Sequence, residues 1–232
     1  MRAIVVANGE WPGDIGFQLR PGDLVAAVDG GALHLRRAGI VPHYLLGDFD
    51  SLPDEAVAEY RARGTRIRRY PVDKDKTDTH LALDLLAEQG YDEIVLLGVT
   101  GDRLDQTLAT LLLAARVVED RGVRLRVVDA RNSAVILVPG LEARVCGKSG
   151  DKVSLIPLRD TASGISTQGL AYPLNNGSLP WGVTLGVSNH LTGARATVTL
   201  RKGLLLVTHH GDQRTGGVEV VRANPGAGMR QL

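Results

Sequence analysis

The sequence is short of cysteine, of aromatic residues and of long apolar runs, and each shortage excludes a class of protein. Its 232 residues include one cysteine, so a disulfide within the chain and a zinc site built from cysteines are both excluded. No apolar run is long enough to cross a bilayer. The run at residues 3–7 is also too short for the hydrophobic region of a signal peptide. We therefore expect a cytoplasmic protein that has no membrane partner.

An excess of positive charge is missing as well. The 27 Lys and Arg residues are matched by 26 Asp and Glu residues, which leaves a net charge of +1. A protein built around the phosphate backbone of nucleic acid usually carries a clear basic excess. Arginines do cluster between residues 61 and 69, but no aromatic residue is interleaved with them. We expect these arginines to lie on a solvated helix end and strand face, and we expect no nucleic-acid partner.

The first half of the chain, residues 1–132, alternates short apolar runs with helical patterns. The apolar runs lie at residues 3–8, 23–30, 44–48, 66–71, 93–98 and 124–129. The helical patterns lie at residues 32–39, 52–63, 79–90 and 105–122, and three of them end in a glycine: Gly39, Gly90 and Gly122. Most runs are apolar on both faces, which is typical of a parallel sheet covered on each side. This half predicts an open, Rossmann-like, mostly parallel sheet with helices on both faces.

The second half, residues 133–232, shows a different pattern. Its apolar runs are short, rich in Val, Leu and Thr, and separated by Gly, Pro and Asn. No convincing amphipathic helix is found after residue 130. Short strands at close spacing predict an all-β sandwich or barrel. The expected fold class is therefore α/β, with an N-terminal α/β domain followed by a C-terminal β domain.

Three clusters of aspartates stand where a predicted strand gives way to a predicted helix. They are Asp48 and Asp50, then Asp73, Asp75 and Asp78, and then Asp102 and Asp105. Open α/β sheets bind their ligands at the carboxyl ends of the strands. Carboxylates brought together repel one another and need a cation, and hard oxygen ligands suit magnesium. Three clusters at one end of a sheet therefore favour a metal and phosphate site.

The alternative is that each aspartate caps its own helix, because Asp is a favoured N-cap residue and suits the positive end of a helix. For any single aspartate this is the better hypothesis. For three clusters that share one end of the sheet, the metal and phosphate site is the better one.

Taken together, the motifs resemble the thiamine pyrophosphokinase family. The matching segments are Asp29-Gly30-Gly31, GDFDS at 47–51, DKDKTD at 73–78, Gly101-Asp102-Arg103-Leu104-Asp105, T-x-G-L-x-Y-P-L at 167–174 and Gly186-Val187-Ser188-Asn189. The resemblance implies transfer of a pyrophosphoryl group from ATP to the hydroxyl of thiamine, which gives thiamine diphosphate and AMP. It also implies a homodimer with the active site between subunits, and domains at 1–132 for metal and nucleotide and 133–232 for thiamine.

The acidic and basic residues of these motifs are the candidates for catalysis. We expect Asp48, Asp50 and Asp75 to bind Mg²⁺ or to hold its waters. Asp29 and Asp78 are candidates for the same set, or for contacts with thiamine and with the loop backbone. Lys76 and Arg103 are expected to bind phosphate oxygens, and salt bridges to neighbouring aspartates are the alternative. Asp105 is expected to orient the substrate hydroxyl or accept its proton, and helix capping is an equal alternative for it.

Smaller residues and the β half supply the remaining candidates. Gly30, Gly31 and Gly101 are expected to let the nucleotide approach the backbone closely, and Thr77 is also expected to bind the nucleotide. Ser188 and Asn189 are expected to bind the thiamine pyrimidine. Trp181 is a candidate stacking surface at even odds with a core position. Four residues are expected to have structural positions, Tyr172 and Cys146 in the core and His209 and His210 exposed on a hairpin.

Three positions depart from the usual pattern of the family. Gln106 stands where His is common, His190 where Glu is often found, and His80 where an acidic residue is more usual. None of the three removes a carboxylate from the acidic motifs. The alternatives are a pyrophosphokinase for another small alcohol, such as a hydroxymethyl pterin or pyrimidine, or a non-catalytic sensor of thiamine or nucleotide. A sensor is expected to lose an acidic ligand, and this chain keeps all of them.

Overall fold

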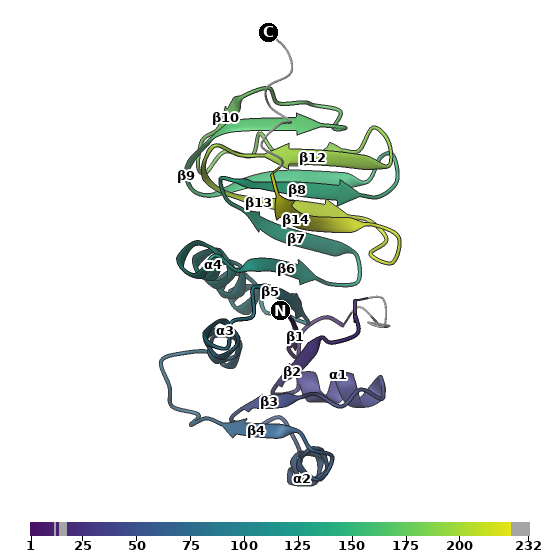
Figure 1. Ribbon diagram of the computed structural model, residues 1–232, viewed down its shortest axis with the longest axis vertical. Helices are drawn as coiled ribbons and strands as arrows, with labels where there is room; N and C mark the ends of the chain where they lie inside the picture. The colour runs from purple at the N-terminus through teal and green to yellow at the C-terminus, as the bar shows by residue number, and fades with distance from the viewer. Residues whose placement is uncertain (12, 14–17, 224–232) are drawn as a thin grey trace. The chain divides into compact units, whose positions relative to one another are not determined.

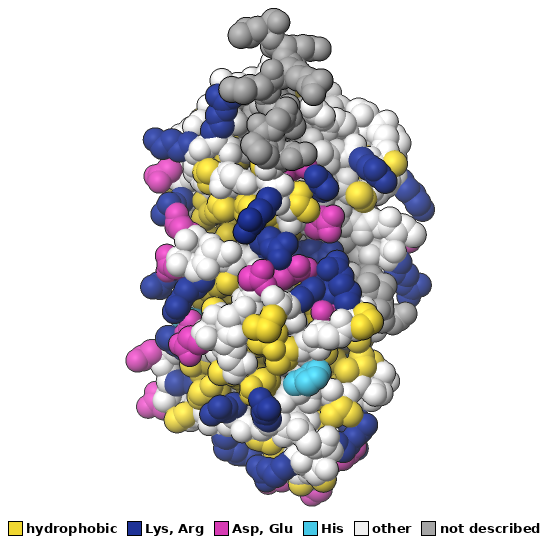
Figure 2. All heavy atoms as spheres, in the orientation of Figure 1, with side chains coloured by type: hydrophobic (Ala, Val, Ile, Leu, Met, Phe, Trp, Pro, Cys, Tyr) yellow, Lys and Arg dark blue, Asp and Glu magenta, His cyan; other side chains and the backbone are white. Residues whose placement is uncertain are grey.

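The computed structural model describes residues 1–11, 13 and 18–223, and the chain divides into two compact units. Unit 1 spans Met1–Ala130 and unit 2 spans Arg131–Leu232. Unit 1 holds all the helices of the described residues, and unit 2 is built from strands, so the expectation of an α/β protein is confirmed. None of the described helices is both long and apolar enough to cross a membrane. On the face drawn in Figure 2, basic and acidic side chains are interspersed.

Unit 1 is a parallel sheet with helices on both faces. Its strands are β1 (Arg2–Val6), β2 (Leu24–Val28), β3 (Tyr44–Gly47), β4 (Arg66–Arg69), β5 (Glu93–Leu97) and β6 (Arg124–Val128). They pair in parallel in the order β6-β5-β1-β2-β3-β4. Its helices are α1 (Gly31–Arg37), α2 (Asp54–Ala62), α3 (Asp78–Glu88) and α4 (Leu104–Arg121). Figure 1 shows α1 and α2 on one face of this sheet and α3 and α4 on the other.

Simple sequence rules account for these elements. The strands β1, β2, β3 and β5 are buried along nearly their whole length, as their continuous apolar runs predict. The three glycines predicted to end helices do so in the left-handed conformation, with φ of +70° at Gly39, +81° at Gly90 and +66° at Gly122. Thr77 is the N-cap residue of helix α3, and its side chain accepts a hydrogen bond from the His80 backbone N–H. Because all six strands are parallel, their carboxyl ends share one edge of the sheet.

Unit 2 is built from antiparallel strands. They are β7 (Asn132–Leu137), β8 (Leu141–Cys146), β9 (Lys152–Gln168), β10 (Gly177–Leu179), β11 (Asn189–His190), β12 (Arg195–Thr199), β13 (Lys202–His210) and β14 (Gly217–Arg222). The order is β14-β8-β12-β9-β13-β7, and β10 and β11 also pair with β9. The long strand β9 connects two groups of strands, because it pairs with β13 over most of its length and with β12 near its end. Apolar side chains from these strands form one buried core.

Two expectations for the strands of unit 2 are wrong. His209 is fully buried, with Nε2 3.1 Å from the Asp151 carboxylate and Nδ1 3.2 Å from the Gln213 amide, whereas His210 is exposed as expected. The two histidines differ because successive residues of a strand face opposite sides. Cys146 is exposed, since it is Val145 that points from β8 into the core.

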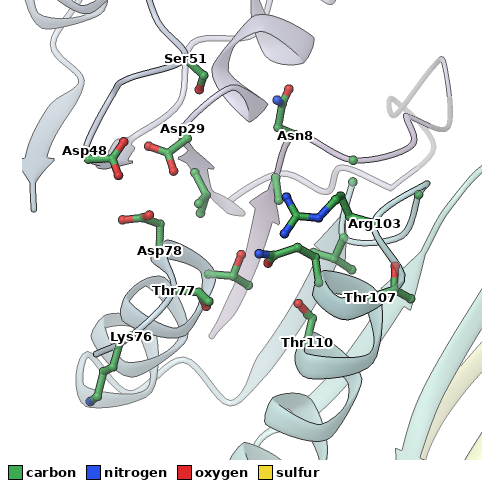
Figure 3. Close-up of a pocket in the computed structure, with 18 of the residues that line it drawn as sticks. Asn8, Asp29, Asp48, Ser51, Lys76, Thr77, Asp78, Arg103, Thr107 and Thr110 are labelled. Atoms are coloured by element: carbon green, nitrogen blue, oxygen red, sulfur yellow. The ribbon is translucent and has the colours of Figure 1, made fainter. Parts of the chain in front are cut away.

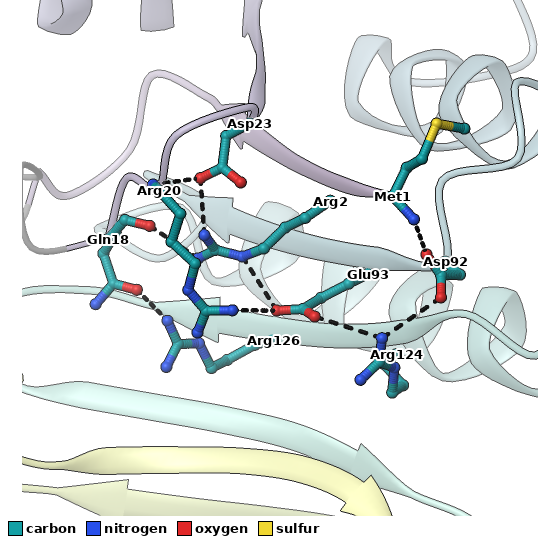
Figure 4. Close-up of polar contacts among 9 residues, drawn as sticks. All are labelled: Met1, Arg2, Gln18, Arg20, Asp23, Asp92, Glu93, Arg124 and Arg126. Carbon is teal, nitrogen blue, oxygen red and sulfur yellow. Dashed lines mark hydrogen bonds and ion pairs between the residues drawn. The ribbon is translucent and has the colours of Figure 1, made fainter.

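An ion-pair network joins the amino-terminal ends of the strands of unit 1 (Figure 4). Arg2, the first residue of β1, contacts the Asp23 carboxylate at 2.7 Å and Glu93 at 3.0 Å. Its guanidinium also donates to the Gln18 backbone carbonyl at 2.8 Å. The Arg2 and Asp23 side chains are 9% and 6% exposed, so this pair lies out of solvent. Arg124 extends the network at the surface, 3.4 Å from Glu93.

We predict that Arg2→Met lowers the free energy of unfolding by about 3 kcal/mol, because it leaves the Asp23 carboxylate buried without its partner. Arg124→Met is the matched control and should cost less than about 1 kcal/mol, because its ion pairs are partly exposed. Chemical denaturation measures both values. Equal losses in the two variants would contradict the assignment of Arg2 as the buried partner.

Candidate active site

A cavity of about 710 Å³ lies at the carboxyl ends of the parallel strands of unit 1. Many of the candidates from the sequence line it, namely Asp29, Asp48, Asp50, Asp75, Lys76, Thr77, Asp78, Gly101 and Arg103. They come from the segments that follow β2, β3, β4 and β5, so the parallel order of the sheet brings distant motifs to one place. Figure 3 labels six of them around the cavity: Asp29, Asp48, Lys76, Thr77, Asp78 and Arg103.

The turn after β3 directs two aspartates to the cavity. Phe49 has φ of +66° and a buried side chain, so it anchors the turn to the core. A left-handed conformation costs a bulky residue free energy, and such strain is often found at functional sites. The Asp48 carboxylate accepts a hydrogen bond from the Asp50 backbone N–H at 3.1 Å. The neighbours of Phe49 on both sides, Asp48 and Asp50, therefore line the cavity.

Asp29 is fixed by the same turn. It follows β2 with φ of +43°, and its carboxylate accepts a hydrogen bond from the Phe49 N–H at 3.3 Å. A Cβ atom at Gly47 would lie 1.6 Å from Asp29 Oδ1, and Gly47 itself has φ of +144°. Glycine at position 47 is therefore required for Asp29 to take this position.

Three carboxylates, those of Asp29, Asp48 and Asp78, point toward one another at one end of the cavity (Figure 3). Burial and then the charge of Asp78, with a smaller effect of Asp48, raise the pKa of Asp29 to about 7. Asp78 Oδ1 is buried and has no hydrogen-bond partner among the described residues. Nowhere among the described residues do three His, Cys, Asp or Glu side chains already lie close enough together to hold a metal ion.

Lys74 is the residue of this site that the sequence reasoning missed. Its ammonium lies 3.3 Å from Asp48 Oδ2 and 3.2 Å from Asp78 Oδ2, and it donates to the Pro71 carbonyl at 2.9 Å. Burial alone would lower the pKa of Lys74, but its contacts with Asp78 and Asp48 outweigh that effect and raise the pKa. The motif DKDKTD holds two lysines among its aspartates, and no local pattern distinguishes Lys74 from Lys76.

The two predicted phosphate ligands make salt bridges in this structure, as the alternative proposed. Lys76 lies 2.7 Å from Asp84 of α3 and points away from the cavity (Figure 3). Arg103 points into the cavity, and its guanidinium donates to both carboxylate oxygens of Asp105, at 2.9 and 2.6 Å. This contact lowers the pKa of Asp105 to about 2, which makes Asp105 a weak proton acceptor while the ion pair is intact.

The hypothesis that each aspartate caps its helix is wrong for this fold. The residues at the N-cap positions of α1 to α4 are Gly30, Pro53, Thr77 and Arg103. Asp78 and Asp105 instead lie in the first turns of α3 and α4. Their charges still suit the positive helix end, but their oxygens are not used as caps.

The glycines have separate roles. A Cβ at Gly30 would lie 2.4 Å from the Asn8 side chain, and a Cβ at Gly31 would lie 2.1 Å from the Val6 carbonyl oxygen. Both are therefore needed for packing beside β1, and neither is among the residues that line the cavity. Gly101 does line it. Neutral polar residues that the sequence did not single out complete the lining, among them Asn8, Ser51, Thr107 and Thr110.

The candidates of unit 2 divide into supporting and exposed residues. Asn189 is buried, and its amide is used by the protein itself, since it accepts from the Tyr172 N–H at 3.0 Å and donates to the Tyr172 carbonyl at 2.8 Å. Tyr172 is 69% exposed, so the expectation of a core position for it is wrong. Trp181 is 66% exposed. Ser188 is exposed with φ of +63°, and its N–H donates to Ser154 Oγ at 3.1 Å.

Comparison with known proteins adds the family to this geometry. Residues 19–127 match the family model described as the thiamin pyrophosphokinase catalytic domain, and residues 142–205 match that of the thiamin pyrophosphokinase vitamin B1 binding domain. The thiamine pyrophosphokinase of Bacillus subtilis (strain 168) is 32% identical over 185 residues, which are 80% of this chain and 86% of that protein. The chain belongs to the thiamine pyrophosphokinase family.

Solved structures of thiamine pyrophosphokinases have the same fold. A crystal structure of the protein from Bacillus subtilis superposes with a TM-score of 0.82 at 30% identity, over 91% of this chain and all of that one. The protein from Geobacillus thermodenitrificans gives a TM-score of 0.78 at 30% identity, over 92% and 99% of the two chains. The match to the thiamine pyrophosphokinase catalytic domain lies within unit 1, which holds the cavity, and the match to the vitamin B1 binding domain lies within unit 2.

We predict that, without metal, the free energy of unfolding of the wild-type protein falls relative to that of Asp29→Asn as the pH rises from about 4 to about 7. A carboxyl whose folded pKa lies near 7 and whose unfolded pKa lies near 3.8 stays protonated in the folded state across this window. Its stabilising contribution is complete below pH 4 and lost as the pH rises through 7. Chemical denaturation in a chelator at several pH values measures it. Parallel pH profiles for the two proteins would contradict the raised pKa.

Proposed function

We propose that this chain transfers the pyrophosphoryl group of ATP to the hydroxyl of thiamine, which gives thiamine diphosphate and AMP. The observation that carries the proposal is the cavity of unit 1, in a chain of the thiamine pyrophosphokinase family. Carboxylates of Asp29, Asp48 and Asp78 face one part of it, and the guanidinium of Arg103 faces another. We propose residues 1–132, which include unit 1, as a Rossmann-like nucleotide domain, and residues 133–232 as a β-sandwich that binds thiamine.

The donor set of the cavity fits magnesium. Burial, and then repulsion from Asp78 and Asp48, raises the pKa of Asp29, and the buried Asp78 Oδ1 has no partner among the described residues. The single Lys74 ammonium at this end of the cavity does not balance the three carboxylates. A hard dication with oxygen ligands corrects both. Asp48, Asp50 and Asp75 are the proposed ligands, with Asp29 and Asp78 as further members of the set. When bound, the ion offsets the charge of the phosphate oxygens.

The other residues of the cavity position the two substrates. The alcohol attacks the β-phosphorus and AMP leaves, so the main requirements are alignment of the two oxygens and neutralisation of charge. Arg103 supplies a planar cation that exchanges its contact with Asp105 for phosphate oxygens. Gly101 and Thr77 line the cavity next to the amino-terminal ends of α4 and α3, which favour phosphate.

The thiamine side uses exposed groups of unit 2. Trp181 and Tyr172 present aromatic surface that a cationic ring can stack on, and Ser188 has an accessible hydroxyl. Asn189 acts as a positioning residue, since its amide already binds the backbone of Tyr172. His190 lies edge-on to Tyr172 with ring centroids 5.9 Å apart. This departure from the family pattern therefore stands beside the proposed acceptor pocket, where a preference for a related alcohol would arise.

A homodimer accounts for the large apolar side chains left exposed. Helix α4 exposes Leu104, Leu108 and Leu112, which are spaced four residues apart and so lie along one face. The segment before β11 exposes Val183, Leu185 and Val187. A second copy that covers such surfaces gains from their burial. We propose that the thiamine pocket of one subunit faces the acidic cavity of the other.

Incubation of the purified protein with ATP, Mg²⁺ and thiamine should yield AMP and thiamine diphosphate in equal amounts. Asp48→Asn should lower the turnover number by at least about 100-fold, because it removes charge from the proposed metal site. Chromatography of both products measures the reaction. ADP formed together with thiamine monophosphate would contradict pyrophosphoryl transfer. Turnover with a hydroxymethyl pterin or pyrimidine, and none with thiamine, would establish the alternative acceptor.

Mixed dimers test the shared site. Asp50→Asn is expected to inactivate the acidic cavity, and Trp181→Ala is expected to weaken thiamine binding without unfolding an exposed loop. At low thiamine, dimers of one chain of each kind should regain about half of the wild-type activity, because one of the two sites then carries neither change. Mixed dimers no more active than the sum of the parents would mean that each chain completes its own site.

A further inference from the structure

The Lys74 ammonium lies where negative charge is most concentrated in the cavity. It contacts Asp48 and Asp78, and all three side chains are largely buried, with 13 or 14% of each exposed. Lys76, two residues along, has a side chain that is 47% exposed and pairs with Asp84 outside the cluster. The structure therefore distinguishes two lysines that the sequence presents as equivalent.

The charges of this cluster do not balance. Asp29, Asp48 and Asp78 bring three carboxylates together, and Lys74 is the one basic side chain recorded in contact with them among the described residues. One ammonium offsets one negative charge. A dication with more contacts would neutralise the cluster better than the ammonium does, but the two cannot occupy the same space between Asp48 and Asp78.

Lys74 is also able to leave this position without disrupting the fold. It lies in the segment between β4 and α3, outside both elements, and the other recorded contact of its ammonium is the Pro71 carbonyl in the same segment. A lysine has a flexible four-carbon stem and a compact charge, so its ammonium can move to a new partner at little cost. An ion pair inside a helix or strand would not have this freedom.

We propose that Lys74 is the resident cation of the cavity: its ammonium neutralises Asp48 and Asp78 in the metal-free protein and leaves both carboxylates when a divalent cation binds there. This proposal rests on the proposed magnesium site. It makes Lys74 a positioning residue that keeps the carboxylates together before the metal binds. It also makes Lys74 a competitor that lowers the affinity for the free metal ion.

Calorimetric titration of the nucleotide-free protein with Mg²⁺ tests the competition between the Lys74 ammonium and the metal ion. Lys74→Met keeps the apolar stem and removes the charge, and it should bind Mg²⁺ about tenfold more tightly or better than wild type, as expected for loss of one charge at this distance. Lys74→Arg should restore weaker binding. Lys76→Met is the matched control, with the same change of charge in the same segment, and should alter the affinity less than about threefold.

Thermal unfolding gives a second readout. Without metal, Lys74→Met should melt below wild type, because Asp48 and Asp78 repel each other without their cation, and saturating Mg²⁺ should remove most of the difference. Lys76→Met should show no such metal-dependent gap. If Lys74→Met binds Mg²⁺ no more tightly than wild type, or if neither protein binds it, the role of Lys74 is overturned. Unchanged Mg²⁺ affinity together with normal formation of thiamine diphosphate would overturn the role of Lys74 and leave the proposed pyrophosphoryl transfer intact. Tighter Mg²⁺ binding by Lys74→Met in a protein that forms no thiamine diphosphate would support the role of Lys74 and overturn the proposed pyrophosphoryl transfer.

Discussion

Mutual repulsion of carboxylates at the carboxyl edge of the parallel sheet is the constraint on which the rest of this site depends. Asp29, Asp48 and Asp78 would separate if the chain allowed it. The backbone prevents this, since Gly47 leaves space for Asp29 and Phe49 anchors the turn in a left-handed conformation. The site thus combines unfavourable electrostatic energy, which the proposed cation would relieve, with backbone strain at Phe49, which it would not. The proposed affinity for a hard dication has its physical basis in this arrangement, because a ligand that removes repulsion gains the free energy that folding spent on it.

The opposite edge of the same sheet supplies stability that the site does not. Parallel strands place their first residues together, and here these residues form ion pairs between Arg2, Asp23 and Glu93 with little exposure to solvent. At that edge each charge has a partner of opposite sign, whereas at the carboxyl edge like charges are gathered. A protein tolerates a destabilising site only when other parts of the fold are well satisfied. The paired charges and the gathered carboxylates therefore lie at opposite ends of the same strands.

The elements and the location of the site could be predicted from the sequence, but the partners of individual side chains could not. Continuous apolar runs and C-terminal glycines are local signals, and they located the strands and helices of unit 1 to within a few residues. The rule for parallel sheets then predicted that the clusters containing Asp48 and Asp78 share one edge, and the family resemblance added Asp29. The choice between Lys74 and Lys76 depends on the path of a loop, which no local pattern encodes. The burial of His209 and the exposure of Tyr172 likewise depend on which strand covers which face.

The groups that remain unsatisfied give a clearer indication of ligand contact than the motif to which a residue belongs. Asn189 and Gly31 belong to motifs of the family, yet the amide of Asn189 is bonded to backbone and Gly31 is enclosed by β1. By contrast, Asp78 Oδ1 and the Thr107 hydroxyl are buried without partners among the described residues, and both residues line the cavity. Buried polar atoms rarely remain unpaired in native proteins, so these two atoms are the candidates for contact with a ligand. Thr107 lies on α4, whereas Asp78 begins α3, so ligand contacts are expected at both of these helices. A nucleotide matches both of these contacts. Its anionic end would be held near Asp78 through the proposed metal, and its neutral end could form a hydrogen bond with Thr107.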